Sequence, residues 1–500
     1  MRANFWLTRR WLFVFILLFS GVMEARAEVK LSDTFSVTGF LRHQLAVHTG
    51  ETNPNNLSPN ATNQTDRNEI NLSRSFFQTE WTYLPNDAFK LYSKVKLISD
   101  QTKDLDSGLK GYNAFPLGTP KYGTYLRPDN DTELDAEMSE LYADVSLGNL
   151  WVRLGKQQIV WGEMISSRIL DVINPLDLSW HFQFEPEEFE NIRMAQWALR
   201  ARYNVPQGTT LPWLKDIYFE GFLNPGDVSP QIMPAPGSPY NVKPTTSPLF
   251  RVTEKDRRGD MEYGFRIGGG IGQVFGTLNY ISHYSQSGFW EYKGSTLRPG
   301  PPSPANPFLT DNKYPRVNLY GGSLNYSFPY PINITATYEA LYNPDEPYYD
   351  NRFATPRIVN NHVLKHAIRF DRSTFVLPRP ISAMMIQLQF SETRVWDNGQ
   401  IKTTPAPYLP ASNNWIDHTQ NSVTLNLSQD LWHNNINVSF LAVYDLDDAH
   451  YVRPGFKYKY GNHWIFDIYG VILGGAEART GRFASMYWAD EVFGRITYQF

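Results

Sequence analysis

The sequence predicts an all-β protein, a transmembrane antiparallel β-barrel of 16 to 18 strands with one inward-folded loop. About eighteen segments of roughly ten residues alternate apolar and polar side chains, which is the length that a tilted membrane strand requires. The connections alternate between short turns and long polar loops, as in outer-membrane barrels. Aromatic residues form 15% of the chain, and many lie at the ends of the alternating segments, where interfacial girdles belong.

Residues 1–27 have the features of a cleaved export signal. Arg2, Arg9 and Arg10 form a basic end, an apolar run covers 11–19, and Ala25-Arg26-Ala27 is a small-x-small cleavage site. The apolar run is too short to span a bilayer, which needs about twenty residues. Cleavage would remove four arginines and one glutamate, so the net charge falls from −4 to −7. We expect residues 28–500 to form one outer-membrane barrel, because no break in composition divides them.

The strands follow from a period of two. In 89–99, for example, Phe89, Leu91, Val95 and Leu97 point one way and the lysines between them point the other. The same pattern places strands at 35–47, 70–84, 89–99, 141–147, 150–160, 195–203, 217–222, 261–268, 273–284, 317–328, 332–342, 362–370, 381–393, 419–427, 436–444, 452–460, 464–473 and 492–500.

Turn residues sort the connections into two classes. Tight turns occur at 85–86, 148–149, 269–272, 329–331, 432–434 and 461–462, and the loops between them are long and rich in Pro, Asn and Gly. Outer-membrane barrels have short periplasmic turns and long external loops. We therefore expect both ends of the barrel domain on the side of the short turns.

The segment between the strands ending at Val160 and beginning at Ala195 lacks a strand period over nearly thirty residues. It holds one short amphipathic turn at 165–170 and several charged and aromatic side chains, and a long irregular insert of this kind tends to be functional. We expect 162–190 to fold into the lumen, either as a constriction or as a structural plug. An oxygen-rich metal site in the acidic run at 185–190 is a weaker alternative, because the spacing of known calcium loops is absent.

Charged residues of alternating sign fall on neighbouring predicted strands. They are candidates for the pore lining, where a transverse field would orient solutes and set ion preference. The simpler interpretation, which we favour, is that inward charges pair with one another on the wall. The candidates are Lys94, Lys96, Glu140, Asp144, Arg153, Arg200 and Arg202.

Several classes of function are disfavoured. The chain has no cysteine, so thiol chemistry and disulfides are excluded, and its acidic balance argues against a nucleic-acid partner. Its ten histidines make no spaced catalytic or metal signature, and we expect no cofactor and no enzymatic activity. A barrel hydrolase remains an alternative, because a fold can bring a Ser and a His together from distant positions.

The last segment, 492–500, alternates and ends in an aromatic residue. Ile496, Tyr498 and Phe500 share one face. This pattern is similar to the signal that outer-membrane assembly machinery reads, so we expect that machinery as a partner.

Two short stretches carry a resemblance. Leu154-Gly-Lys-Gln-Gln-Ile-Val-Trp-Gly-Glu163 and Asp171-Val-Ile-Asn-Pro-Leu-Asp177 resemble a porin-like family of Gram-negative outer-membrane barrels, a domain of unknown function with a Gly-Arg/Lys-Gln…Trp-Gly-Glu…Asn-Pro-x-Asp signature. The resemblance spans most of the chain after the leader, but only 154–177 is sharp. The resemblance identifies eight signature positions and implies no specific role for them: Gly155, Gln157, Trp161, Gly162, Glu163, Asn174, Pro175 and Asp177.

The resemblance implies a barrel in the outer membrane, in contact with its lipid and lipopolysaccharide, that serves envelope transport beside periplasmic or inner-membrane partners. The leading expectation is a porin-like channel or transporter for small or hydrophobic organic solutes, because sixteen or more strands leave a water-filled lumen. A non-conducting scaffold of a trans-envelope complex is the first alternative. A barrel hydrolase that acts on envelope lipids or peptides is the second.

Overall fold

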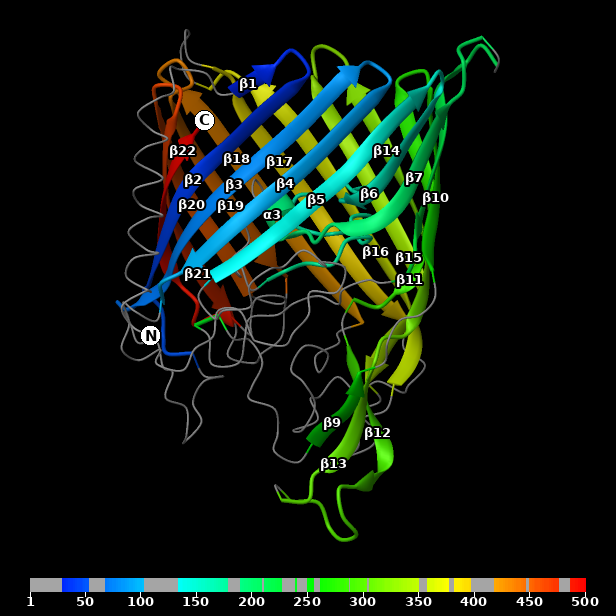
Figure 1. The fold of residues 1–500 in the computed structure, drawn as a ribbon, viewed down its shortest axis with the longest axis vertical. Helices are drawn as coiled ribbons and strands as arrows, with labels where there is room; N and C mark the ends of the chain where they lie inside the picture. Colours follow the sequence, from blue (N-terminus) through cyan, green and yellow to red (C-terminus); the bar gives the residue numbers. More distant parts are fainter. Residues whose placement is uncertain are drawn as a thin grey trace.

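Eighteen antiparallel strands close into one barrel, as expected (Figure 1). The computed structural model describes residues 29–53, 68–102, 134–178, 189–208, 211–226, 239–240, 250–255, 261–286, 288–303, 305–349, 358–376, 382–396, 418–446, 449–475 and 486–500. The barrel is closed by the pair β2–β22, in register from Phe40 opposite Gln499 to His48 opposite Glu491. A short strand, β1 (Val29–Ser32), adds to β2 outside this closure. The expected leader, 1–27, lies outside the described residues.

The wall strands are close to those that the alternation predicts, with most ends shifted by one to several residues. They are β2 (Phe35–His48), β3 (Ile70–Asn86), β4 (Phe89–Asp100), β5 (Leu134–Leu147), β6 (Leu150–Gln157), β7 (Gln196–Asn204), β8 (Leu214–Asn224), β10 (Glu262–Ile271), β11 (Val274–Tyr284), β14 (Arg316–Phe328), β15 (Ile334–Tyr349), β16 (Ile358–Thr374), β17 (Met384–Trp396), β18 (Thr419–Leu431), β19 (Ile436–Asp445), β20 (Ala449–Tyr460), β21 (Trp464–Gly475) and β22 (Glu491–Gln499).

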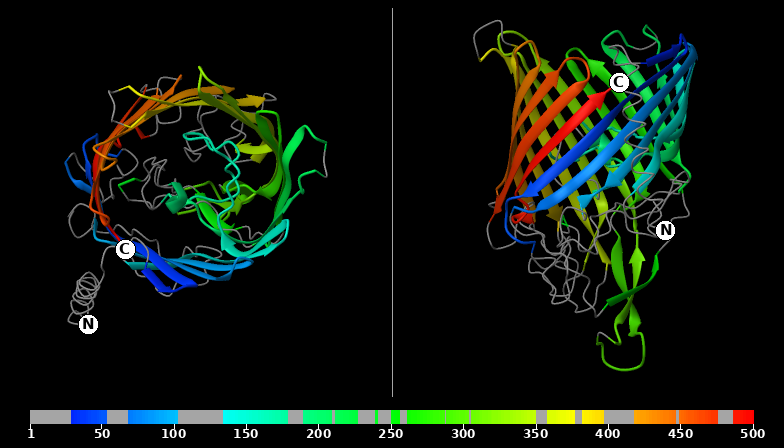
Figure 2. Two further views of the ribbon diagram at one scale, coloured as in Figure 1. Left: turned by 90° about the horizontal axis from the view of Figure 1, so that it is seen from above. Right: turned by 60° about the vertical axis from the view of Figure 1, so that its left-hand side comes forward.

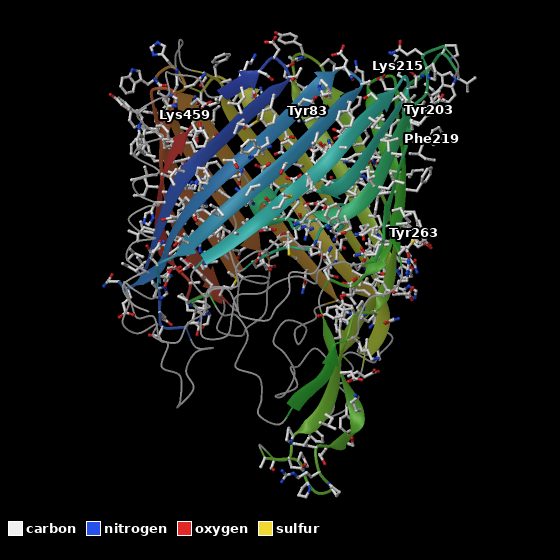
Figure 3. All side chains as sticks on the ribbon, in the orientation of Figure 1. Tyr83, Tyr203, Lys215, Phe219, Tyr263 and Lys459 are labelled. Atoms are coloured by element: carbon white, nitrogen blue, oxygen red, sulfur yellow. The ribbon has the colours of Figure 1, made fainter. Side chains whose placement is uncertain are left out.

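Alternation along each strand separates two environments. On β21, Phe466 and Ile468 are exposed on the outer face, whereas Asp467 and Tyr469 are buried on the inner face. This is the pattern of a wall between lipid and a polar lumen. Large side chains such as Tyr203, Phe219 and Tyr263 project from the outside of the wall (Figure 3).

The two ends of the barrel differ as the turn pattern predicts. β1 and the C-terminus lie with the short turns, and the strand ends that the longer connections join lie at the opposite end (Figure 1). One connection departs from the rule, because β19 and β20 are joined by only three residues at the long-loop end. Among the described residues, no helix is long and apolar enough to cross a membrane.

A small sheet that the sequence did not predict lies beyond the long-loop end. It consists of β9 (Phe250–Lys255), β12 (Phe289–Thr296) and β13 (Phe308–Lys313), with β13 parallel to β9 (Figure 1). Its strands come from two connections that we expected to be irregular. The prolines that suggested loops lie outside these strands, at 225–248 before β9 and at 299–307 between β12 and β13.

The insert between β6 and β7 turns into the lumen, and Figure 2 (left) shows it inside the ring of strands. Two local expectations about it were wrong. β6 ends at Gln157 rather than at 160, and 165–170 forms bends rather than a helical turn. The helix in the described part of the insert is α3 (Phe189–Ile192).

Candidate functional site

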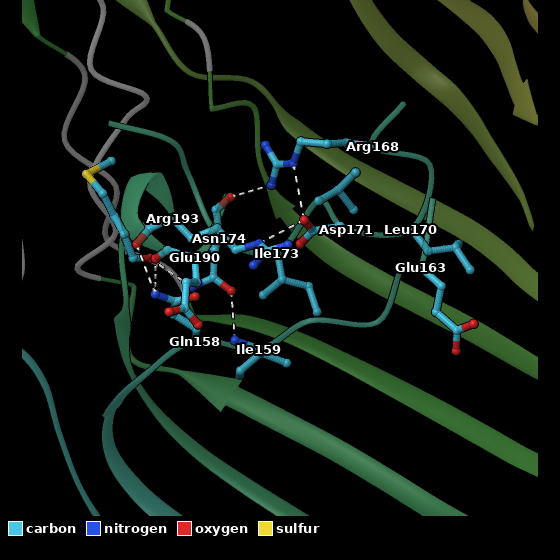
Figure 4. A network of polar contacts seen from close by, with 12 residues as sticks. Gln158, Ile159, Glu163, Arg168, Leu170, Asp171, Ile173, Asn174, Glu190 and Arg193 are labelled. Carbon is cyan, nitrogen blue, oxygen red and sulfur yellow. Dashed lines mark hydrogen bonds and ion pairs between the residues drawn. The ribbon is translucent and has the colours of Figure 1, made fainter. Parts of the chain in front are cut away.

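The site is the lumen around the inward segment, which we call the lumen loop and define as 158–178 together with 189–195. Two buried amide side chains tie its ends to the wall and to each other. Gln157 donates to the carbonyl of Ala198 on β7 at 2.9 Å. Asn174, which has no exposed surface, accepts from the amide of Ile159 and donates to the carbonyl of Met194, each at 2.8 Å (Figure 4). The loop therefore leaves and returns at one fixed place.

Two glycines allow the chain to enter the lumen. Gly155 has a φ of +136°, and a Cβ there would lie 2.2 Å from the carbonyl oxygen of Leu141 on β5. A Cβ on Gly162 would lie 2.5 Å from the amide nitrogen of Asp171. Both positions require the absence of a side chain, the first for conformation and the second for a close backbone approach.

Trp161 anchors the first turn of the lumen loop to the β7–β10 side of the wall. Its indole N–H donates to Glu220 at 2.8 Å, and its ring meets Phe222 edge-on at 5.5 Å. Glu220 is almost fully buried and is paired with Arg200 at 2.7 Å and Arg266 at 2.8 Å. Two guanidinium groups and an indole N–H therefore donate to one buried carboxylate and satisfy its oxygens.

The middle of the lumen loop is held by wall side chains that bind its backbone. Glu339 on β15 accepts from the amides of Glu163 and Leu170. Gln389 on β17 accepts from the amide of Ile165 at 3.0 Å. Further contacts come from Arg369, whose guanidinium donates to the carbonyl of Glu163, and from Thr424, whose hydroxyl meets that of Ser166. Glu339, Gln389 and Thr424 are at most 1% exposed.

A charged cluster lies on the lumen side of the loop (Figure 4). Asp171 is 2.9 Å from Arg193 and 3.6 Å from Arg168, and Arg168 also donates to the carbonyl of Asn174 at 2.7 Å. The centre of the Phe189 ring lies 4.9 Å from the guanidinium of Arg193 and 5.8 Å from that of Arg168. Burial lowers the pKa of the Arg168 guanidinium from its ordinary value, and the neighbouring Asp171 opposes that shift.

A cavity of about 540 Å³ separates this face of the loop from the opposite wall. On the loop it is lined by the charged cluster, and on β19–β21 by residues that include Ser439, Arg453, Lys457 and Tyr469. A second cavity, of about 240 Å³, lies between the loop and β11, β14, β15 and β16. The lumen loop therefore fills one part of the barrel and leaves a polar space beside β17–β21.

The predicted pore-lining charges do lie on inward positions, but five of the seven form ion pairs on the wall. Lys94 is 3.2 Å from Glu140, Arg153 is 2.6 Å from Asp144, and Arg200 is bound to Glu220. The other two are Lys96, which is 5% exposed, and Arg202, whose guanidinium lies 3.8 Å from the centre of the Tyr218 ring. Within the described part of the chain, none of the seven lines the large cavity.

The signature positions divide by role. Gly155, Gln157, Trp161, Gly162 and Asn174 fix the path of the loop, as described above. Near the end of the loop, the carbonyl of Pro175 accepts from the amide of Met194 at 2.9 Å, and the amide of Asp177 donates to the carbonyl of Ile192 at 2.7 Å. Glu163 is different, because its side chain is exposed and lies at the cavity.

The predicted assembly residues lie at the closing strand. Ile496 is 47% exposed, and Tyr498 packs against His463 and Trp464. Phe500 stacks on Phe77 at 6.1 Å and exchanges backbone hydrogen bonds with Gly39. Their role in assembly stays a prediction.

The acidic run is only partly described. Glu190 is in α3 and exposed, whereas 185–188 lie outside the described residues. No group of three or more histidine and carboxylate side chains among the described residues could hold a metal ion.

Sequence reasoning missed the wall residues that hold the loop and those that face it. Glu339 and Gln389 each occupy one inward position on a strand of alternating polar residues, and the basic residues of β20 do the same. Their inward direction could be predicted, but nothing in the local pattern distinguishes a loop anchor from a wall ion pair. Only the path of the lumen loop makes that distinction.

Comparisons with known proteins agree with the geometry. The fold resembles solved structures that include Acinetobacter baumannii OccAB3 (TM-score 0.50, 8% identity, covering 93% of this chain and 99% of that chain). Pseudomonas aeruginosa OccK9 (OpdG) has a TM-score of 0.48 at 10% identity, covering 93% and 97%. Salmonella typhi OmpF in complex with daunomycin has 0.42 at 9%, covering 95% and 100%.

The likeness to OccAB3 shows the fold alone, a closed antiparallel barrel. A comparison with curated protein sequences finds no match. A family model described as "Protein of unknown function (DUF1302)" matches residues 7–400, which is well over half of the chain. The chain therefore belongs to the DUF1302 family.

Proposed function

We propose that this protein is a porin-like diffusion channel of the outer membrane for small polar solutes, with the lumen loop as its constriction. One observation carries the proposal. The loop is fastened to the β7–β18 part of the wall and leaves a polar cavity of about 540 Å³ on its other side. A plug that sealed the barrel would contact the wall all the way round. The described part of this loop is instead fastened to β7–β18.

The lining indicates the solute class. Its polar members include Gln387, Asn426, Asn437 and Ser439, and its charged members come from both the loop and β20. Groups of this kind replace part of a solute's hydration shell and suit water-soluble molecules. The polar lining favours such solutes over the hydrophobic compounds that the resemblance to the family also implies.

The location and partners that we propose follow from the fold. The chain would be exported with residues 1–27 as a leader, inserted by the barrel-assembly machinery through its last strand, and surrounded by lipid and lipopolysaccharide. Transport partners in the periplasm or inner membrane would then meet the short-turn end. This arrangement is supported by the porin fold and by the gathering of long connections at the other end.

The test is planar-bilayer conductance of protein extracted from the outer membranes of an expressing host. We compare the intact chain with a variant that lacks 165–177. The intact protein should give discrete current steps, and the deletion should enlarge them because the lumen loop occupies the passage. If the intact barrel carries no current and the deletion variant gives large current steps, the loop is a plug. If neither protein carries current, although heat-modifiable migration shows that both are folded barrels, the scaffold function is favoured.

A hydrolase has one specific observation in its favour. His43 Nδ1 lies 3.0 Å from the hydroxyl of Ser75 between β2 and β3. In the described part of the chain no carboxylate contacts His43, so the group that orients the imidazole in a catalytic triad is missing. We rank this function below the channel. Loss of a lipid-hydrolysing activity in Ser75→Ala, with conductance unchanged, would reverse that ranking.

A further inference from the structure

Basic side chains line the large cavity on both of its sides. Arg168 and Arg193 lie on the lumen loop, and Arg453, Lys457 and Lys459 lie on β20. On β20 these residues occupy alternate positions with Gly455 between Arg453 and Lys457, so all three face the lumen on one strand. The cations on β20 therefore form a column that runs along the passage towards the short-turn end.

Two of the carboxylates in this cavity are each shared by two cations. Asp171 contacts both Arg168 and Arg193. Asp467 on β21 is 3.5 Å from Lys457 and 2.9 Å from Arg495. One carboxylate cannot neutralise two cations, so the arginine pair at Asp171 keeps an excess positive charge among the contacts of the described residues.

The other acids of the described lining do not contact these groups. The carboxylate of Glu163 lies apart from the cluster around Asp171 (Figure 4). The carboxylate of Asp430 accepts a hydrogen bond from the side-chain amide of Asn437 at 2.8 Å. The described lining of the cavity therefore holds five basic side chains and four carboxylates, so its formal charge is positive by one.

One of the cations on β20 is also fixed in orientation. The Arg453 guanidinium lies 4.2 Å from the centre of the Tyr469 ring, and its side chain is 5% exposed. A guanidinium held on an aromatic face is restricted to one plane, and its donors match the geometry of a carboxylate or phosphate. A hydrated ammonium at the same place would not have this directionality.

We propose that this cavity selects small organic anions, whose carboxylate or phosphate groups pass between Arg193 on the loop and the column of cations on β20. The inference rests on the proposed channel function. It names Lys457 and Lys459 as residues that determine solute preference. An excess of one charge in a lining raises the local counter-ion concentration, by about tenfold or more where the walls are of one sign, and salt screens the effect.

The experiment measures solute entry into proteoliposomes at low salt and reversal potential in a salt gradient. The probes are gluconate, glucose 6-phosphate, neutral glucose and cationic glucosamine, which are similar in size. We expect the anions to enter about tenfold faster than glucosamine, the lower end of the effect of field focusing. Gluconate and glucose 6-phosphate separate a preference for carboxylate from one for phosphate.

The variants locate the preference. Lys457→Gln with Lys459→Gln should bring the anion-to-cation ratio close to one. Lys459→Gln alone should lower it less, and this variant keeps the ion pair between Lys457 and Asp467 if the double variant folds poorly. The matched control is Lys215→Gln, which removes an exposed lysine of β8 near the same end of the barrel that is not among the residues lining the cavity (Figure 3). It should leave the ratio unchanged.

The outcomes separate the two proposals. No current from a folded intact barrel would overturn the channel function. Current with no preference, or with preference for cations, would overturn the inference and leave the channel function standing. An anion preference that survives the substitutions at Lys457 and Lys459 would also overturn it, because selection would then lie elsewhere in the barrel.

Discussion

Polar residues at inward positions have different roles in two parts of the barrel wall. We divide the eight strands β15–β22 into a docked half, β15–β18, and an open half, β19–β22. In the docked half, Glu339, Gln389 and Thr424 are buried and hold the lumen loop. In the open half, β19–β22, Arg453 and Lys457 face the cavity. The difference teaches that an inward polar residue is not by itself a pore residue. Its role depends on whether the lumen loop covers it.

The energetics of the two halves differ accordingly. In the docked half, each removed acceptor leaves a partly or fully buried loop amide unsatisfied, at a cost of about 1–3 kcal/mol. In the open half, water in the cavity can replace a lost partner, so a substitution changes the local field more than it changes stability.

The largest effect should come from Gly155→Val, which disturbs the path of the lumen loop on which the difference between the two halves depends. A branched side chain cannot adopt a φ of +136°, and its Cβ would collide with the Leu141 carbonyl. We expect a sharp fall in the yield of folded barrel. The measurement is the fraction with heat-modifiable migration in outer membranes, with Gly148→Val as the control, because a Cβ there has no neighbour within 4 Å and its φ is also positive. Equal yields would contradict the assigned role of Gly155.

Next in size is Glu339→Leu, which breaks the docked half alone. It leaves the amides of Glu163 and Leu170 without their acceptor, which destabilises the docked loop by about 1–3 kcal/mol for each. The barrel should still form, while the current through single channels becomes noisier and larger on average. Steady current identical to that of the unchanged protein would show that Glu339 does not hold the loop.

A matched pair on β17 sharpens the comparison. Gln389 binds the lumen loop, whereas Gln387, two residues away on the same face, binds Asp371 and Asn426 on neighbouring strands. Gln389→Leu should increase current noise, because one loop amide loses its acceptor at about 1–3 kcal/mol. Gln387→Leu should leave the noise unchanged. Similar noise in the two variants would remove the distinction between anchor and wall.

The smallest effect should follow Tyr469→Leu in the open half. It removes the ring beneath Arg453, an interaction of about 0.5–2 kcal/mol, and leaves every loop anchor in place. We expect unchanged noise and a modest loss of anion preference. Increased noise would show that the open half also restrains the loop.

Much of the wall could be predicted from the sequence, because a period of two requires only local information. Phe466 and Asp467 show this, since their opposite faces follow directly from alternation. The inward fold of the insert was also predictable from its length and its lack of period. The small sheet of β9, β12 and β13 was not, because its strands are short and come from connections that contain many prolines.

The site itself was less predictable, for a physical reason. Arg200 and Arg453 both occupy inward positions of alternating strands, and nothing near them in sequence shows that one binds a buried Glu220 while the other lines a cavity. That difference arises from contacts between residues far apart in the chain. The predicted charges therefore identified the inner face but not the passage.

The way in which the lumen loop is fastened has an evolutionary consequence. Glu339 and Gln389 bind the amides of Glu163, Ile165 and Leu170, a feature that every residue except proline provides. Side chains at the constriction can therefore be exchanged without undoing the attachment. A barrel built in this way can acquire new solute preferences by single substitutions at the tip of the loop, while the scaffold that carries them stays under separate selection.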